Sequence, residues 1–404
     1  MNKKIFSLRN NTEVLYKRNL DTPRVALCFN LSLNEPIPNP GVYTLMTRLL
    51  TQGTTNRTSE QLSNELDMYA IELSCELKLD YLKLKFVCLN EDFEKALELL
   101  EDIVKNSTFE EFEKERVKLI GEIEAQLDSP RAKVIDNYYK NLYAEHHYGY
   151  TNTVILENLK NITKEDVLQG YRTFLENSKK VIAFVGDLEF EQVQTALNEK
   201  LADLPISIQE LPKLSIPELN DSKDVEIIKQ DANQAHIIQG WLVETANSDD
   251  YPILALLNII LGASGLSSRL FLELRDKKGL AYVVRSSYDV AKLCANFSIY
   301  IATEPKNIQI SLDGFKEEIN KIKDVLVSEE ELNNARNNIL GKWAFSQEDN
   351  SQQASTYAHY AVKGLGFDFN DKAKERIKYV TPEQIKSVAN KYFNDKYVVS
   401  IIKP

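Results

Sequence analysis

Residues 265–282 read G-L-S-S-R-L-F-L-E-L-R-D-K-K-G-L-A-Y, which predicts a helix followed directly by a strand. The helix can begin at Ser267 or Ser268, because a serine hydroxyl accepts hydrogen bonds from the first free backbone N–H groups. Gly279 is expected to end it, since glycine is common just past a helix end. The apolar run 280–284 then resumes as a strand. This stretch indicates a fold in which helices and strands adjoin.

An arginine and a tyrosine flank that junction, seven residues apart. Arg275 lies near the end of the predicted helix and Tyr282 on the predicted strand, so both can face one cleft. A guanidinium offers five fixed donors and a phenol adds one directed O–H, so together they can hold a peptide carbonyl or the oxyanion formed during hydrolysis. Taken alone, such a pair is more often a solvated charge and a half-buried ring.

A second motif lies in the first half, where a turn leads into a short helix. Residues 39–42 read N-P-G-V before the predicted helix, and residues 53–54 read G-T after it. Together with residues 265–282, this frame resembles the insulinase/pitrilysin-type zinc metallopeptidases, the inverzincins, over nearly the whole chain. The resemblance implies that residues 44–48 stand where that family carries H-x-x-E-H.

The zinc motif itself is replaced in this chain. Thr44 and Arg48 stand where the resemblance places two zinc histidines, and Thr47 stands where it places the catalytic glutamate. Glu122, in an E-x6-E pair with Glu115, keeps the third ligand position. A threonine hydroxyl is a poor ligand, Arg48 adds a fixed positive charge, and one carboxylate does not make a zinc site. We therefore expect no metal in this chain and interpret Glu122 as a solvated residue on an amphipathic helix.

The replaced positions still share one face of a helix. Thr44, Thr47 and Arg48 fall at i, i+3 and i+4 on a predicted helix over 42–51, opposite an apolar stripe. Three roles stay open for this face: lining a chamber, binding a partner, or meeting solvent, which is the commonest role for such a surface.

Two-chain members of the resembled family divide the work between subunits. One chain carries H-x-x-E-H, while its partner lacks the motif but keeps the arginine and the tyrosine. The resemblance therefore implies a non-zinc-binding subunit of a heterodimeric zinc metallopeptidase that degrades or processes peptides. Arg275 and Tyr282 would bind substrate, this chain would hold no cofactor, and zinc would lie in the homologous partner subunit. Two alternatives stay open, a catalytically inactive structural homologue and a peptide-binding homodimer.

Composition places the chain among ordinary globular proteins. Its 404 residues suffice for two domains, with 43% hydrophobic and 27% charged residues. The net charge of −11 disfavours unspecific binding to nucleic acid or anionic membranes and favours attraction of cationic peptides. We find no signal-peptide core and no membrane-length apolar run, so a cytoplasmic location and no membrane partner are expected. The four cysteines lack C-x-x-C spacing and are expected to be reduced.

Periodicity predicts paired strands interleaved with helices. Alternation over 71–79 and 82–86 is typical of a half-buried antiparallel hairpin. Helical spacing follows over 91–105, 109–127 and 131–144. The second half repeats this plan, with a strand predicted over 235–243 and a hairpin near 281–302.

A weak internal repeat supports duplication. Short matches recur in one order at nearly constant spacing, such as 119–121 with 339–341, and Thr163 with Thr381. Thr163 with Asp166 also has the spacing of a helix capping box. We expect an α+β fold of two structurally similar domains, each a mostly antiparallel sheet packed with helices, arranged as half of a clam-shell.

The proline-rich stretch around 204–224 is the predicted boundary. A first peptidase-like domain with the degenerate zinc motif is expected over 1–205, a linker over 206–222, and a second peptidase-like domain with the Arg/Tyr pair over 223–404.

Overall fold

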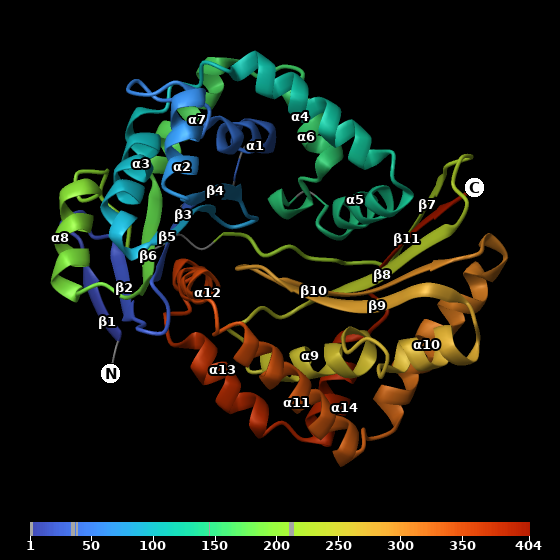
Figure 1. Cartoon of the computed structure of the whole chain (residues 1–404). Helices are drawn as coiled ribbons and strands as arrows, with labels where there is room; N and C mark the ends of the chain where they lie inside the picture. The colour runs from blue at the N-terminus through green and yellow to red at the C-terminus, as the bar shows by residue number, and fades with distance from the viewer. Residues whose placement is uncertain (1–2, 34–36, 38, 145, 210–213) are drawn as a thin grey trace. The chain divides into compact units, whose positions relative to one another are not determined.

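The computed structural model describes residues 3–33, 37, 39–144, 146–209 and 214–404 (Figure 1). Residues 210–213 of the predicted linker lie outside the described residues. By packing, the chain forms two compact units. The first unit comprises Met1–Glu122, Val154–Leu214 and Ala344–Asn370, and the second comprises Ile123–Thr153, Ser215–Trp343 and Asp371–Pro404.

The first unit is built on a six-stranded sheet in the order β1-β2-β6-β3-β5-β4. β2 and β6 are parallel, and the other neighbours are antiparallel. The strands are β1 (Lys3–Ser7), β2 (Glu13–Arg18), β3 (Arg24–Leu33), β4 (Glu72–Leu77), β5 (Leu82–Leu89) and β6 (Ser178–Gly186).

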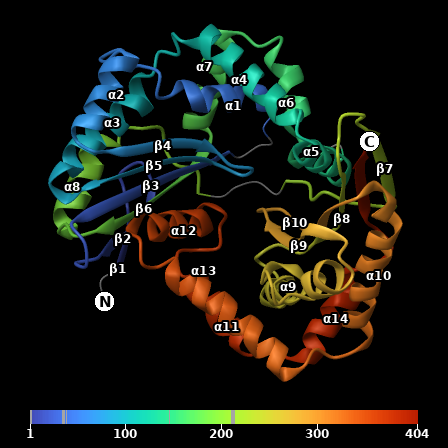
Figure 2. The ribbon, with the colours of Figure 1, turned by 45° about the vertical axis from the view of Figure 1, so that its right-hand side comes forward.

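Helices cover both faces of this first sheet. On one face, Phe184 of β6 packs edge-to-face against Phe93 at the start of α3, 5.4 Å between ring centres. On the other face, Val181 and Ala183 pack against Tyr357 of α12, and Figure 2 shows that helix lying along the strands. The helices that lie wholly in this unit are α1 (Pro40–Leu49), α2 (Ser59–Met68), α3 (Phe93–Asn106), α7 (Lys164–Glu176), α8 (Phe190–Lys200) and α12 (Asn350–Val362).

The second unit has a five-stranded sheet in the order β7-β11-β8-β10-β9, with β7 and β11 parallel. Its strands are β7 (Lys223–Ile228), β8 (Ala235–Val243), β9 (Ala281–Val290), β10 (Ala295–Thr303) and β11 (Val398–Lys403). Ile237 and Phe297 pack on one face in a core with residues of α9 (Tyr251–Asn258), α10 (Ile308–Asp324) and α14 (Pro382–Tyr392). Ile238 and Tyr300 face the other side, against α5 (Pro130–Leu142).

Four further helices each span a boundary between the stretches that make up the two units. They are α4 (Phe112–Leu127), α6 (Asn152–Leu159), α11 (Glu329–Phe345) and α13 (Phe369–Lys378). None of the helices in the described ranges is both long and apolar enough to cross a membrane.

The predicted α+β fold with two similar domains is confirmed. The strand order β2-β6-β3-β5-β4 of the first sheet recurs as β7-β11-β8-β10-β9 in the second, with the parallel pair at the same place. Thr163 and Thr381 each close a capping box at the start of α7 and α14, with Asp166 and Gln384. The position of a helix in the chain does not always decide which sheet it covers. α5 comes from the first half of the chain and covers the second sheet, whereas α12 comes from the second half and covers the first.

Candidate functional site

Arg275 lies on a π-helix, η4 (Phe271–Lys277), which continues a short α-helical start at Arg269 and Leu270. Single π-turns inside helices are frequent at functional sites. Ser268 begins the segment, but its hydroxyl donates to the carbonyl of Gly265 at 2.9 Å. Among the described hydrogen bonds, none runs from a backbone N–H to that hydroxyl, so the predicted cap is not formed there.

Two contacts anchor this helix to the rest of the second unit. Arg269 donates to both carboxylate oxygens of Glu331, at 2.8 and 2.7 Å. Leu274 is fully buried against Gly314 of α10, where an added Cβ would lie 2.2 Å from the leucine methyl group. The backbone that leads into Arg275 is therefore fixed at two points before it.

The helix ends as the sequence predicts, at Gly279. This glycine adopts φ +62°, its N–H donates to the carbonyl of Arg275 at 3.1 Å, and the N–H of Leu280 donates to Leu274 at 2.9 Å. The bond from Gly279 is the single bond of an αL C-cap, and the bond from Leu280 spans the wider turn of the π-helix. The hydroxyl of Thr303 then holds the carbonyl of Leu280 at 2.6 Å, just before β9 begins.

The structure brings Arg275 and Tyr282 together. The guanidinium carbon of Arg275 lies 4.6 Å from the ring centre of Phe271 and 4.7 Å from that of Tyr282. Tyr282 is 77% exposed. Stacking on aromatic faces holds a guanidinium flat and leaves its N–H edge free.

Among the described residues Arg275 has no counter-ion, unlike Glu273, Lys277 and Lys278 nearby. Within the described residues, no carboxylate lies in ion-pair distance of its guanidinium. Glu273 pairs with Lys277 at 2.5 Å, and Lys278 pairs with Glu317 at 2.7 Å. The N–H donors of Arg275 are therefore available to a carbonyl or carboxylate from outside the chain.

The residues predicted to stand in place of the zinc motif lie on α1 in the first unit. Asn39 caps this helix by accepting from the N–H of Val42 at 3.3 Å. The hydroxyls of Thr44 and Thr47 both donate to backbone carbonyls one turn earlier, at 2.7 and 2.8 Å. Such back-bonding is common for threonine inside a helix.

Arg48 lies between the two carboxylates of the E-x6-E pair. It donates to both oxygens of Glu122, at 2.5 and 3.0 Å, and to Glu115 at 3.2 Å. The Glu115 side chain is only 3% exposed. The hydrogen bond from Arg48 lowers the pKa of Glu122 below its ordinary value. Glu122 is thus half of an ion pair, which corrects its interpretation as a merely solvated residue.

These contacts do not fit a zinc ion. The cation Arg48 already pairs with the two carboxylates, and both threonine hydroxyls are used by the backbone. Across the described ranges, no group of three or more histidine, cysteine, aspartate or glutamate side chains is placed to hold a metal.

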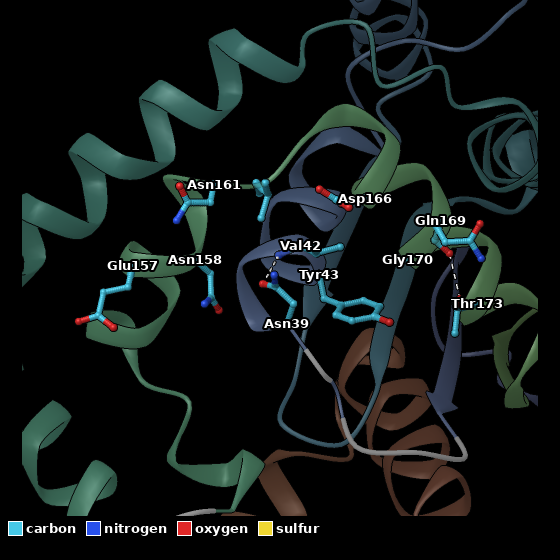
Figure 3. Close-up of a pocket in the computed structure, with 11 residues that line it drawn as sticks. Asn39, Val42, Tyr43, Glu157, Asn158, Asn161, Asp166, Gln169, Gly170 and Thr173 are labelled. Carbon is cyan, nitrogen blue, oxygen red and sulfur yellow. Dashed lines mark hydrogen bonds between the residues drawn. The ribbon is translucent and has the colours of Figure 1, made fainter.

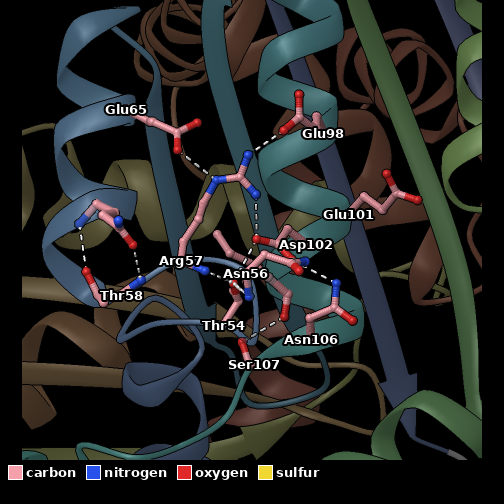
Figure 4. Close-up of polar contacts among 12 residues, drawn as sticks. Thr54, Asn56, Arg57, Thr58, Glu65, Glu98, Glu101, Asp102, Asn106 and Ser107 are labelled. Atoms are coloured by element: carbon pink, nitrogen blue, oxygen red, sulfur yellow. Dashed lines mark hydrogen bonds and ion pairs between the residues drawn. The ribbon is translucent and has the colours of Figure 1, made fainter.

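A second polar network fixes the turn that follows α1 (Figure 4). Arg57 forms ion pairs with Glu65 at 2.9 Å, with Asp102 at 2.7 Å, and with Glu98. Asp102 also accepts from the hydroxyl of Thr54 at 2.7 Å. Sequence reasoning used Thr54 only as part of the family frame and missed this network, which attaches the turn to α3.

A polar pocket of about 580 Å³ also went unpredicted (Figure 3). It lies beside the N-terminal end of α1 and is lined, among others, by Asn158 of α6, Gln169 of α7 and Asn161 of the segment between these two helices. The amide oxygen of Asn158 is buried and has no hydrogen-bond partner in the described structure. No periodicity in the sequence marks residues from three helices as neighbours.

Comparisons with known proteins identify the family. Residues 14–153 match the model described as insulinase (peptidase family M16), and residues 161–339 match that described as peptidase M16 inactive domain. An uncharacterized zinc protease of Mycobacterium leprae, ML0855, is 23% identical over 92% of this chain and 84% of its own length.

Two solved structures share the fold. A protease from Helicobacter pylori has a TM-score of 0.91 at 20% identity, covering 100% of this chain and 99% of that one. A peptidase M16 inactive domain from Pseudomonas fluorescens has a TM-score of 0.89 at 21% identity, covering 100% and 98%. The fold is that of a peptidase-type chain. The protein belongs to the insulinase family, peptidase family M16.

Proposed function

We propose that this chain is the non-zinc-binding subunit of a heterodimeric zinc metallopeptidase and that Arg275 and Tyr282 hold its peptide substrate. The observation that carries the proposal is the guanidinium of Arg275, which lies against two aromatic rings. No acid of the described chain pairs with it. A cation that is positioned but unpaired is suited to a ligand that brings its own oxygen.

The chain's own residues would act by positioning and by charge stabilisation. Arg275 would donate its N–H groups to a substrate carbonyl, and the hydroxyl of Tyr282 would add a second donor beside it. Donors fixed in place before reaction stabilise developing negative charge without reorganisation. The homologous partner would supply zinc and the general base, because Arg48 fills the corresponding face here.

Purification of the tagged chain from its native cell, followed by mass spectrometry and zinc analysis, tests the proposal. A stoichiometric partner with H-x-x-E-H and about one zinc per heterodimer supports it, as a single three-ligand site predicts. A zinc-free homodimer would instead favour the alternative, a catalytically inactive structural or peptide-binding homologue.

A further inference from the structure

Two arginines share one tyrosine ring on the second sheet, on the face that α5 covers. The guanidinium carbon of Arg131 lies 5.6 Å from the ring centre of Tyr300, and that of Arg285 lies 5.9 Å from it. Arg285 is directly opposite Tyr300 in the β9–β10 register. Both arginines are exposed, whereas Tyr300 is 6% exposed. The ring is thus a buried base on which two accessible cations rest.

A histidine fixes the far end of that ring. Nδ1 of His236 and the hydroxyl of Tyr300 are 2.8 Å apart. Burial and the nearby charge of Arg131 lower the pKa of His236, so its ring is neutral at pH 7. The histidine therefore orients the phenol and adds no charge of its own.

The cations of this patch lack counter-ions. In the described ranges, neither Arg131 nor Arg285 has a carboxylate in ion-pair distance. Asp289, whose charge acts on Arg285, accepts a hydrogen bond from Tyr139 at 3.1 Å. Arg131 also lies in the first turn of α5, where the helix dipole is positive and disfavours a cation.

These features concentrate positive charge on a chain whose net charge is −11. Two solvated arginines stacked on a tyrosine would not indicate a binding site if an acid of the chain paired with them, or if they lay far from a helix N-terminus. Here two guanidinium groups and a helix N-terminus lie together without an ion pair. An external carboxylate would remove the repulsion among them and could accept from both arginines.

We propose that Arg131, Arg285 and Tyr300 form a binding site for a carboxylate of a peptide, so that acidic residues in the substrate favour binding. This inference deepens the proposed function and rests on it. It also reverses the expectation, drawn from net charge alone, that cationic peptides are preferred. Charge summed over a whole chain does not set the sign of the field at one site.

Fluorescence anisotropy of the full chain with matched labelled peptides tests the site. One peptide is unstructured and contains glutamates, and the other has glutamine at those positions. The glutamate peptide should bind about tenfold tighter, as about 1.4 kcal/mol of charge-assisted contact predicts. The difference should vanish in Arg131→Gln/Arg285→Gln and persist in Arg131→Lys/Arg285→Lys. Inorganic phosphate, added as a competitor, separates a general anion site from one that selects peptides.

The control variant is Arg172→Gln, which removes an exposed arginine of α7 in the first unit. It should keep the full preference. Equal binding of the two peptides by the wild-type chain, or binding of neither, would overturn the inference. So would competition by millimolar phosphate as strong as that by the glutamate peptide. A chain that recruits its zinc partner yet shows no acidic preference would refute this site alone and leave the proposed function standing.

Discussion

Arg48 donates to both carboxylate oxygens of Glu122, at 2.5 and 3.0 Å, across the face where the family's zinc motif would lie. The same guanidinium reaches the buried carboxylate of Glu115. A side-chain cation thus contacts both carboxylates of this face. The contacts of Arg48 with Glu115 and Glu122 join the two helices α1 and α4.

Replacing Arg48 with alanine should therefore destabilise the chain. Glu115 would keep a buried charge, and breaking a buried pair costs ~3–5 kcal/mol. Lys118 remains 3.5 Å from Glu115, and the Glu122 side chain is 45% exposed, so we expect about 2 kcal/mol in urea unfolding at pH 7. The loss should shrink as the pH falls, because the lowered pKa of Glu122 contributes stability only while that group is ionised.

The control for this variant is Arg172→Ala, which breaks an exposed pair with Glu165. Exposed pairs contribute ~0–1 kcal/mol. If Arg48→Ala were no more destabilising than Arg172→Ala, the structural role of Arg48 would be excluded.

Gly279 and Gly341 offer a matched pair of alanine substitutions with opposite expected signs. Gly279 has φ +62°, so Gly279→Ala should cost ~1–2 kcal/mol through backbone strain. Gly341 lies inside α11 with nothing within 4 Å of an added Cβ, so Gly341→Ala should stabilise by ~0.5–1 kcal/mol. Thermal unfolding of both variants measures this. A neutral Gly279→Ala would mean that the αL cap at this glycine does not fix the backbone beside Arg275.

Because of Lys180, the free energy of unfolding should rise as the pH increases above 8. Its side chain is fully buried in β6, its ammonium donates to the carbonyl of Ser178 at 3.3 Å, and burial lowers its pKa to about 8. Between pH 8 and the unfolded value near 10.5, the unfolded chain binds more protons, so the free energy of unfolding increases as the pH rises.

Lys180→Met should remove that slope and stabilise the chain at pH 7 by about 2 kcal/mol, since a buried charge is costly. Lys114→Met, which removes an exposed lysine, is the control and should keep the slope. Urea unfolding at pH 7, 8, 9 and 10 compares them. A wild-type stability that falls steadily over this range, with Lys180→Met unchanged from it, would contradict the prediction.

Local patterns in the sequence predicted much of this fold and few of its long-range contacts. The alternation over 82–86 and the capping box at Thr163 depend on neighbouring residues, and β5 and α7 bear them out. The pairing of Arg48 with Glu122 joins residues 74 apart, which periodicity cannot connect. The packing of α12 on the first sheet is likewise a long-range contact that no local pattern shows.

The candidate site, too, was predicted where it depends on neighbouring residues and missed elsewhere. The spacing of Arg275 and Tyr282 around Gly279 could be read from the sequence, because a glycine-ended helix and the following strand are local features. The π-helix could not be read from the sequence, because the spacing of its apolar residues fits an ordinary α-helix as well. The stacking of Phe271 on Arg275 was also missed.

Tyr282→Phe separates the hydroxyl of this residue from its ring. The ring would still stack on Arg275, so only one donor to the substrate is lost, and we expect kcat/KM of the assembled enzyme to fall about tenfold. Tyr282→Ala should lower kcat/KM further, because Arg275 would also lose one of the two aromatic rings it stacks on. Equal effects of the two variants would show that the hydroxyl alone matters.

The most direct test is peptide hydrolysis by the purified assembly containing Arg275→Ala. The account predicts that kcat/KM falls ~10²–10³-fold, the usual cost of losing one preorganised donor, while zinc content and subunit stoichiometry stay unchanged. Lys277→Ala, on the same π-helix, is the control and should retain near wild-type activity. An Arg275→Ala assembly with unchanged kcat/KM would contradict the account.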